Sequence, residues 1–349
     1  MTACHPDGEE RAITRSSKFA APHSGVPMPD VPQHDQHAGA QLSRRVVLKR
    51  IGIAMGVAVA GTVVLGVADA DRGEDGSRPL FSTVDGVGAP TLVFLPGIGA
   101  STRFWRYALT TGDGPVLSGR HLLIDLLGFG RSPKPWVTYD VARHVEALRR
   151  VLADQGRITL VGHSLGARLA IAYAAQYPEQ VERLVLVSLP YFGDGEHAKQ
   201  YFRDKGANGW IWTHLIPMAL MCLFSRRLLG WSFPYLITSV PREVAEDLTQ
   251  MTWRSSTSTI WEVIYGYDLV AAIRRIPATT PFLCLHGDAD DSAPLQRMIE
   301  LQAVHPNCVI RVQHGATHQL PLTHQGWVRA QIASVLGAGI TAPLGTPAH

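Results

Sequence analysis

The sequence predicts an α/β fold, in which a mainly parallel, doubly wound sheet carries helices on both faces. Short β-branched apolar runs alternate with longer helical patterns up to about residue 188, and the alternation resumes over residues 278–337. Such alternation is typical of parallel sheets, because two parallel strands need a crossover connection that is usually a helix. Residues 189–277 break the pattern, which predicts a helical cap inserted between two core strands.

The expected elements follow one another in a regular order. The first part of the core covers residues 78–188 and opens with a β-hairpin between Arg78 and Gly88. Strands are then expected at 91–96, 121–126, 157–162 and 183–188, with helices near 101–110, at 139–154 and at 165–177. The second part, 278–337, is expected to hold strands 281–286 and 308–313 and helices 294–303 and 323–336.

The most informative motif is Gly162-His163-Ser164-Leu165-Gly166, which lies between a β-branched run and an alanine-rich helical segment. A Gly-x-Ser-x-Gly turn at a strand–helix junction is typical of a nucleophile elbow. The turn strains the serine backbone, and its glycines are needed because a Cβ there would collide with the neighbouring strand or helix. The motif predicts a serine hydroxyl at the C-terminal edge of the sheet, beside the backbone N–H of Leu165.

Together with the elbow, four other segments resemble the α/β-hydrolase superfamily, in the branch that carries a helical cap. They are the strand and Pro-Gly loop of 91–101, the Asp-x-x-Gly-x-Gly-x-Ser pattern from Asp125 to Ser132, and the strand-and-loop pair 282–294 and 309–318. The resemblance runs from about Leu80 to about Leu336. It implies a doubly wound sheet of α/β-hydrolase type and a triad in the order nucleophile, acid, histidine.

The resemblance places the catalytic acid in the loop after the strand 281–286. The family pattern is a Gly, the acid three residues later and a Pro four residues beyond, and Asp290 fits this register between Gly287 and Pro294. Asp288 and Asp291 lie in the same loop, and the sequence does not exclude them.

The resemblance places the catalytic histidine at His318, just after the strand 308–313. Members of the family usually have the sequence Gly-x-Gly-His in this loop, and here Thr317 replaces the second Gly. His314, His286 and His163 are expected to be structural.

The expected chemistry needs a base, an orienting acid and oxyanion donors. A neutral serine hydroxyl is a poor nucleophile, so an imidazole must take its proton, while a carboxylate orients and stabilises that imidazole. The oxyanion donors are expected to be the backbone N–H groups of Leu165 and Ile98. Relatives have His-Gly where this chain has Pro96-Gly97, but a backbone donor does not depend on that side chain. Asp125 and Ser132 are expected to brace their loop.

A serine at the elbow points to acyl chemistry. The expected activity is that of a serine hydrolase that cleaves carboxylic esters carrying a hydrophobic group, with no metal or organic cofactor. Relatives with the same triad include carbon–carbon bond hydrolases and cofactor-free perhydrolases, so both remain alternatives. A catalytically slow ligand-binding or signalling module is an alternative of a different class.

The composition of the chain limits which classes of partner are expected. The net charge is +3, with 46% hydrophobic and 17% charged residues, and the basic residues are dispersed, so nucleic acid is not an expected partner. The four cysteines show no paired pattern. Cys284 and Cys308 fall in predicted strands and are expected to be small buried apolar residues, not a disulfide framework.

The N-terminal region has a composition of its own. Residues 1–41 are polar and rich in Pro and His, which predicts disorder, and the tail 338–349 is expected to be loose. Residues 42–70 resemble a twin-arginine export signal: Arg44-Arg45, an apolar run at 51–67 and a small-x-small site ending at Ala70. Cleavage would release an exported protein, and retention would anchor the folded domain outside the cytoplasm. A fortuitous apolar helix in a cytoplasmic protein is the alternative.

The cap is expected to decide the substrate. Its centre, residues 215–240, is strongly apolar and is interrupted by Arg226 and Arg227. Three interpretations remain open: it lines an apolar acyl pocket, it touches a membrane surface with the arginines near headgroups, or it forms the core of the cap itself. The sequence predicts no oligomeric state.

Overall fold

The computed structural model describes residues 75–89, 91–227 and 240–337, together with the single residues Lys49, Ile53, Gly61 and Tyr235. The chain divides into two compact units, Met1–Ala54 and Met55–His349, and the fold described below belongs to the second.

Several expectations fall outside the described residues. They are the tail 1–41, the export signal or anchor at 42–70 apart from three single residues, the tail 338–349 and the part of the cap at 228–239 except Tyr235. These stay predictions. Among the residues that are described, no helix combines the length and the apolar character needed to cross a membrane.

The described residues form a seven-stranded sheet with the order β1-β3-β2-β4-β5-β6-β7. All neighbouring strands are parallel except β1, which runs antiparallel to β3. The predicted fold class is therefore confirmed. The strands are β1 (Ser82–Asp85), β2 (Thr91–Leu95), β3 (Arg120–Ile124), β4 (Ile158–His163), β5 (Val181–Val187), β6 (Phe282–Gly287) and β7 (Cys308–Gln313).

The predicted opening hairpin is wrong. The segment contributes one strand, β1, and that strand pairs with β3 so that Ser82 lies opposite Ile124. The two consecutive strands β1 and β2 are not neighbours, because β3 lies between them. A single strand followed by Gly86 and Gly88 gives the same local pattern as a hairpin, since turn glycines do not reveal which partner a strand takes.

Alternate side chains of the strands pack into two apolar layers. On one face, Leu95 and Leu160 belong to a large core with α3 (Val141–Leu152), α4 (Leu165–Gln176), α11 (Leu269–Arg275) and α12 (Leu295–Val304). On the other face, Phe94 and Val161 belong to a core with α2 (Thr102–Thr110), α13 (Leu320–Thr323) and α14 (Gln325–Gly337). This period of two is what a sheet buried on both faces requires.

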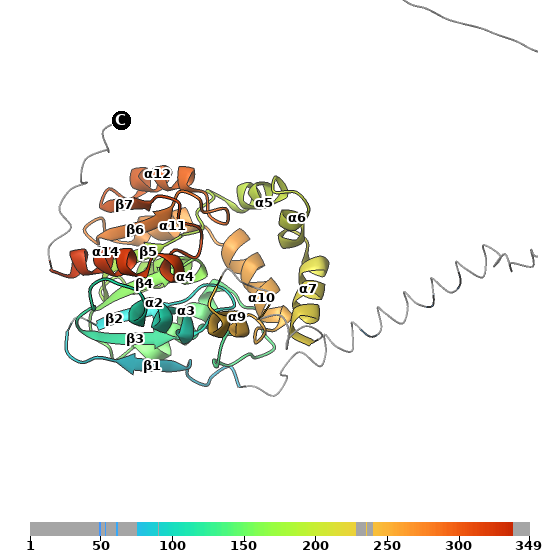
Figure 1. Cartoon of the computed structure of the whole chain (residues 1–349), viewed down its shortest axis with the longest axis horizontal. Coiled ribbons are helices and arrows are strands. Elements are labelled where there is room, and N and C mark those ends of the chain that lie inside the picture. The colour runs from blue at the N-terminus through green and yellow to red at the C-terminus, as the bar shows by residue number, and fades with distance from the viewer. Residues whose placement is uncertain are drawn as a thin grey trace, which may run out of the picture. The chain divides into compact units, whose positions relative to one another are not determined.

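The described part of the insertion between β5 and β6 consists of helices joined by turns and short loops. Figure 1 shows these helices gathered beside the sheet. Met218 and Tyr265 belong to a small apolar core within the cap. Its helices are α5 (Gly195–Arg203), α6 (Ala207–Trp212), α7 (Leu215–Arg227), α9 (Arg242–Asp247), α10 (Trp253–Thr259) and the π-helix η1 (Ile260–Tyr265).

The buried guanidinium of Arg168 joins the helix after the elbow to both ends of the cap. It donates to the carbonyl oxygens of Pro190 at 2.7 Å, Val263 at 2.9 Å and Tyr267 at 3.1 Å. Burial lowers the pKa of Arg168 to about 10, so it stays charged at neutral pH. The last helix of the predicted cap range 189–277, α11, packs against α4 and shares the main core.

Candidate active site

The predicted elbow is a sharp turn between β4 and α4. Ser164 lies there with φ 52° and ψ −115°, a left-handed backbone that a serine rarely adopts. A Cβ on Gly162 would lie 2.5 Å from backbone atoms of Gly166, and one on Gly166 would lie 2.3 Å from the carbonyl oxygen of Leu95. Only glycine fits at either place, so the two flanking residues fix the position of the serine.

The structure brings Ser164, His318 and Asp290 into one hydrogen-bonded chain. His318 Nε2 lies 2.9 Å from Ser164 Oγ. On the other side of the ring, His318 Nδ1 lies 3.0 Å from Asp290 Oδ1 and 2.9 Å from Oδ2. This arrangement can move a proton from the hydroxyl to the imidazole while the carboxylate holds the ring.

Asp290 is held as an anion by its own loop. Its Oδ1 accepts the backbone N–H groups of Ser292 and Ala293, each at 2.9 Å. Burial by itself raises the pKa of this carboxyl, but the hydrogen bond and charge of His318 and the backbone N–H of Ser292 outweigh it, so the pKa lies below its usual value. The acid is therefore ionised wherever the imidazole can act as a base.

The two rival carboxylates lie elsewhere. Asp288 accepts from His314 Nδ1 at 2.7 Å and from the N–H of Gly315 at 2.7 Å. Asp291 accepts from the hydroxyl of Ser292 at 3.0 Å. Neither has a hydrogen bond to His318 among the described contacts, so the loop offers that ring one carboxylate only.

The remaining histidines near the site are neutral supports. His163 Nε2 donates to the backbone carbonyl of His318 at 2.9 Å, and its ring stacks on Phe104. Burial, reinforced by the charge of His318, lowers the pKa of His163 to about 3. His286 Nε2 lies 3.0 Å from the carbonyl of Ala293 and 3.6 Å from Asp290 Oδ2, and burial lowers its pKa. Both rings hold the backbone that carries the triad.

The two expected oxyanion donors lie in the two segments next to Ser164: the turn after β2 and the start of α4. Ile98 lies in a turn closed by the N–H of Ala100, which donates to the carbonyl of Gly97 at 3.2 Å, and Leu165 is the first residue of α4. In the part of the chain that the structure describes, neither N–H donates to a protein acceptor. Both groups are thus available to a ligand oxygen beside Ser164.

A small cavity of about 80 Å³ lies over the serine. Beside Ser164 and His318 it is lined mainly by apolar side chains, among them Phe104, Val244 and Leu248. Its described cap residues come from α9 and its flanks. Helix α7 instead buries Met218 and Cys222 and leaves Ile216 and Phe224 exposed.

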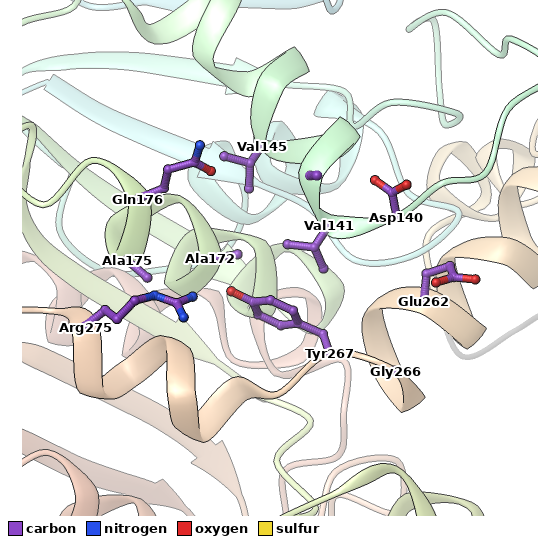
Figure 2. A pocket seen from close by; sticks show the side chains of 11 residues that line it. Asp140, Val141, Val145, Ala172, Ala175, Gln176, Glu262, Gly266, Tyr267 and Arg275 are labelled. Atoms are coloured by element: carbon purple, nitrogen blue, oxygen red, sulfur yellow. The ribbon is translucent and has the colours of Figure 1, made fainter.

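A larger cavity of about 520 Å³ lies between α3, α4 and the segment that joins η1 to α11. Figure 2 shows Val141 and Ala172 on its wall, with Tyr267 and Arg275 across from them. None of the residues lining it belongs to the chain of hydrogen bonds at Ser164.

Three polar residues near the site were assigned no role from the sequence: Ser101, Arg103 and Asp247. Arg103 and Asp247 form an ion pair across 144 positions of the chain, with Arg103 Nε 3.0 Å from Asp247 Oδ1. An isolated Asp in a charged cap segment gives no local signal of such a partner.

The chain is similar to known proteins in sequence and in fold. Residues 92–331 match the alpha/beta hydrolase family. Two curated relatives from Arabidopsis thaliana are similar: probable lysophospholipase BODYGUARD 1, 34% identical over 40% of this chain and 30% of its own length, and probable lysophospholipase BODYGUARD 5, 27% identical over 65% of this chain and 57% of its own length. The matches thus span less than two thirds of these relatives.

Solved structures share the fold. The esterase EaEST from Exiguobacterium antarcticum superposes with a TM-score of 0.59 and 18% identity, over 74% of this chain and 96% of the esterase.

Proposed function

This chain belongs to the alpha/beta hydrolase family, and from that premise we propose that it is a serine hydrolase that cleaves carboxylic esters carrying a hydrophobic group. The observation that carries the proposal is the position of His318, within hydrogen-bonding distance of Ser164 Oγ on one side and of both Asp290 oxygens on the other.

Acylation begins at the serine. Ser164 Oγ attacks the ester carbonyl carbon while His318 Nε2 takes the hydroxyl proton, and the carbonyl oxygen becomes an oxyanion. The N–H groups of Ile98 and Leu165 donate to that oxygen, and Asp290 stabilises the imidazolium. The tetrahedral intermediate then collapses, the bond to the alcohol oxygen breaks, and His318 returns the proton to the leaving alcohol.

Deacylation repeats these steps with water. His318 removes a proton from water as its oxygen attacks the acyl carbon, and the second tetrahedral intermediate expels Ser164 Oγ, which regains the proton. The products are a carboxylic acid and an alcohol, and the residues return to their starting state.

The lining of the small cavity supports a hydrophobic group on the substrate. Phe104, Val244 and Leu248 offer carbon surface and no charge beside the serine. Burying apolar groups there contributes roughly 25 cal/mol per Å². The names of the similar proteins, two probable lysophospholipases and an esterase, are consistent with an ester of this kind.

The test is turnover of a p-nitrophenyl ester series of increasing acyl length by the purified full-length protein. We expect Ser164→Ala to lower kcat by about 10⁴-fold or more. Ser225→Ala, on α7, serves as the control taken through the same purification, and it should keep wild-type turnover. Undiminished turnover by Ser164→Ala would refute the mechanism. Turnover of a vinylogous diketone without ester turnover would favour carbon–carbon hydrolysis instead.

A further inference from the structure

The cap packs directly on the turn that carries one oxyanion donor. A Cβ on Gly99, which has φ 74°, would lie 2.8 Å from Leu248 Cδ2 and 3.2 Å from Met251 Sδ. On its other side the same turn contacts the nucleophile, because a Cβ on Gly97 would lie 3.3 Å from Ser164 Cβ. The turn is thus enclosed between the serine and the segment that follows α9.

A buried polar contact fastens this packing. Asp247, the last residue of α9, is 1% exposed and accepts a hydrogen bond from the hydroxyl of Ser101, the residue directly after the turn. It also accepts from Arg103 Nε at 3.0 Å and from a second guanidinium nitrogen. Ser101 caps α2 by accepting the N–H of Arg103 at 3.1 Å, so Asp247 and the start of α2 form one network.

A carboxylate of the core, Asp125, also binds the N-terminus of α2. Asp125 accepts the N–H of Thr102, and it also accepts the N–H of Arg131 at 2.7 Å. The start of α2 therefore lies between a carboxylate of the core and a carboxylate of the cap. Asp125 holds it whether or not the cap is in place, whereas the contact of Asp247 exists only when α9 covers the turn.

We propose that Asp247 is a positioning residue for the oxyanion hole: through Ser101 and Arg103 it fixes the turn Gly97–Ala100 and so holds the Ile98 N–H toward an oxygen bound at Ser164. The proposal rests on the serine hydrolase function above. Catalysis then requires the closed cap, because withdrawal of α9 removes both the buried carboxylate and the packing of Leu248 from the turn.

Glu246 offers a matched control for Asp247, because both carboxylates accept hydrogen bonds from Arg103. Glu246, next to Asp247, accepts from Arg103 Nη1 at 3.1 Å, but its side chain is 38% exposed and it has no contact with Ser101 among the described hydrogen bonds. Removing Glu246 weakens an exposed ion pair, which contributes little. Removing Asp247 leaves the Ser101 hydroxyl and the guanidinium without their buried acceptor.

The experiment compares Asp247→Ala, Asp247→Asn and Glu246→Gln in the full-length protein. It measures ester kinetics, the rate of labelling by a fluorophosphonate, and inhibition by an alkyl boronic acid, which forms a tetrahedral adduct on the serine. We expect Asp247→Ala to lower kcat by about 100-fold, with similar losses in labelling rate and boronate affinity and little change in KM, because the loss of one oxyanion donor has this size. Asp247→Asn should lose less, since it still accepts from Ser101, and Glu246→Gln should match the wild type.

The outcomes separate the two proposals. If the wild type is labelled at Ser164 and a folded Asp247→Ala keeps its kcat, labelling rate and boronate affinity, the positioning role is refuted and the hydrolase function stands. A rise in KM alone, or an equal loss in Glu246→Gln, also refutes it. If the alanine variant does not fold, Asp247→Asn, of nearly equal volume, is measured in its place, and kcat, labelling rate and boronate affinity equal to those of the wild type then refute the positioning role. A wild type that neither turns over esters nor reacts at Ser164 overturns both.

Discussion

Two Asp–His pairs lie a few residues apart on the same two loops. In only one of them does the histidine also contact a serine, Ser164, among the described hydrogen bonds. In the first, Asp290 and His318 have side chains 0% and 15% exposed and a closest approach of 2.9 Å. In the second, Asp288 and His314 approach to 2.7 Å, but their side chains are 36% and 86% exposed. The shorter contact belongs to the surface pair.

The difference shows that the distance between an acid and a histidine does not make a catalytic site. Water screens the surface pair, so its ion pair contributes little. The buried pair lies in a medium of lower dielectric constant, where the same charges interact more strongly, and its ring continues to Ser164. The backbone of the loop decides which carboxylate turns inward, because Ser292 and Ala293 donate to Asp290.

The largest predicted effect separates the two acids. Asp290→Asn should lower kcat by about 10⁴-fold, because the amide no longer fixes the tautomer of His318. Asp288→Asn should change kcat by less than about two-fold, since an exposed pair is lost. Steady-state kinetics on one ester, with both variants shown to be folded by circular dichroism, make the comparison. Equal losses in the two variants would mean that the assignment of the acid is wrong.

A second prediction concerns acid stability of the buried region. The pKa of His163 lies at about 3 in the folded protein. The unfolded chain takes up a proton below about pH 6.5, so unfolding is favoured as the pH falls from about 6.5 toward 3. His163→Gln keeps an N–H for the carbonyl of His318 but cannot take up that proton.

Urea denaturation at pH 6 and pH 4 measures this contribution. Between pH 6 and pH 4 the free energy of unfolding of the wild type should fall by about 2.5 kcal/mol more than that of His163→Gln, because the unfolded chain takes up a proton over this range and the folded chain does not. The other buried histidines are present in both proteins and cancel. An equal fall in the free energy of unfolding of the wild type and of His163→Gln would show that the folded protein does not keep His163 neutral.

The smallest predicted effect concerns stability and the backbone conformation of two residues, one beside each Asp–His pair. Ser164 has φ 52° and Gly315, beside the surface pair, has φ 70°. Ser164→Gly should raise the free energy of unfolding by about 1 kcal/mol while it abolishes turnover, because strain is relieved. Gly315→Ala should lower it by about 1 kcal/mol and leave turnover intact. Thermal melts check the opposite signs, and a stabilised Gly315→Ala would contradict the account.

Most of the core could be predicted from the sequence, because its signals are local. β-branched runs indicate buried strands, and the strand expected at 157–162 is β4 at Ile158–His163. The elbow is equally local, since both its glycines and its serine lie within five positions. The register after Gly287 favoured Asp290, but only the folded loop separates it from Asp288.

What could not be predicted depends on contacts between distant segments. The sequence does not show which strand β1 pairs with, because a hairpin and a single strand give the same turn glycines. The covering of the turn at Gly99 by Leu248 joins residues far apart in the chain. The same holds for Asp247 and Ser101, whose hydrogen bond spans 146 positions.

The central claim is that Ser164 is an activated nucleophile. Its most direct test is to react the full-length protein with a fluorophosphonate and map the modified peptide by mass spectrometry, in the wild type, His318→Ala and His314→Ala. The account predicts modification of Ser164 in the wild type and in His314→Ala, and its loss in His318→Ala. An unmodified Ser164 in folded wild-type protein, or equal labelling after removal of His318, would contradict it.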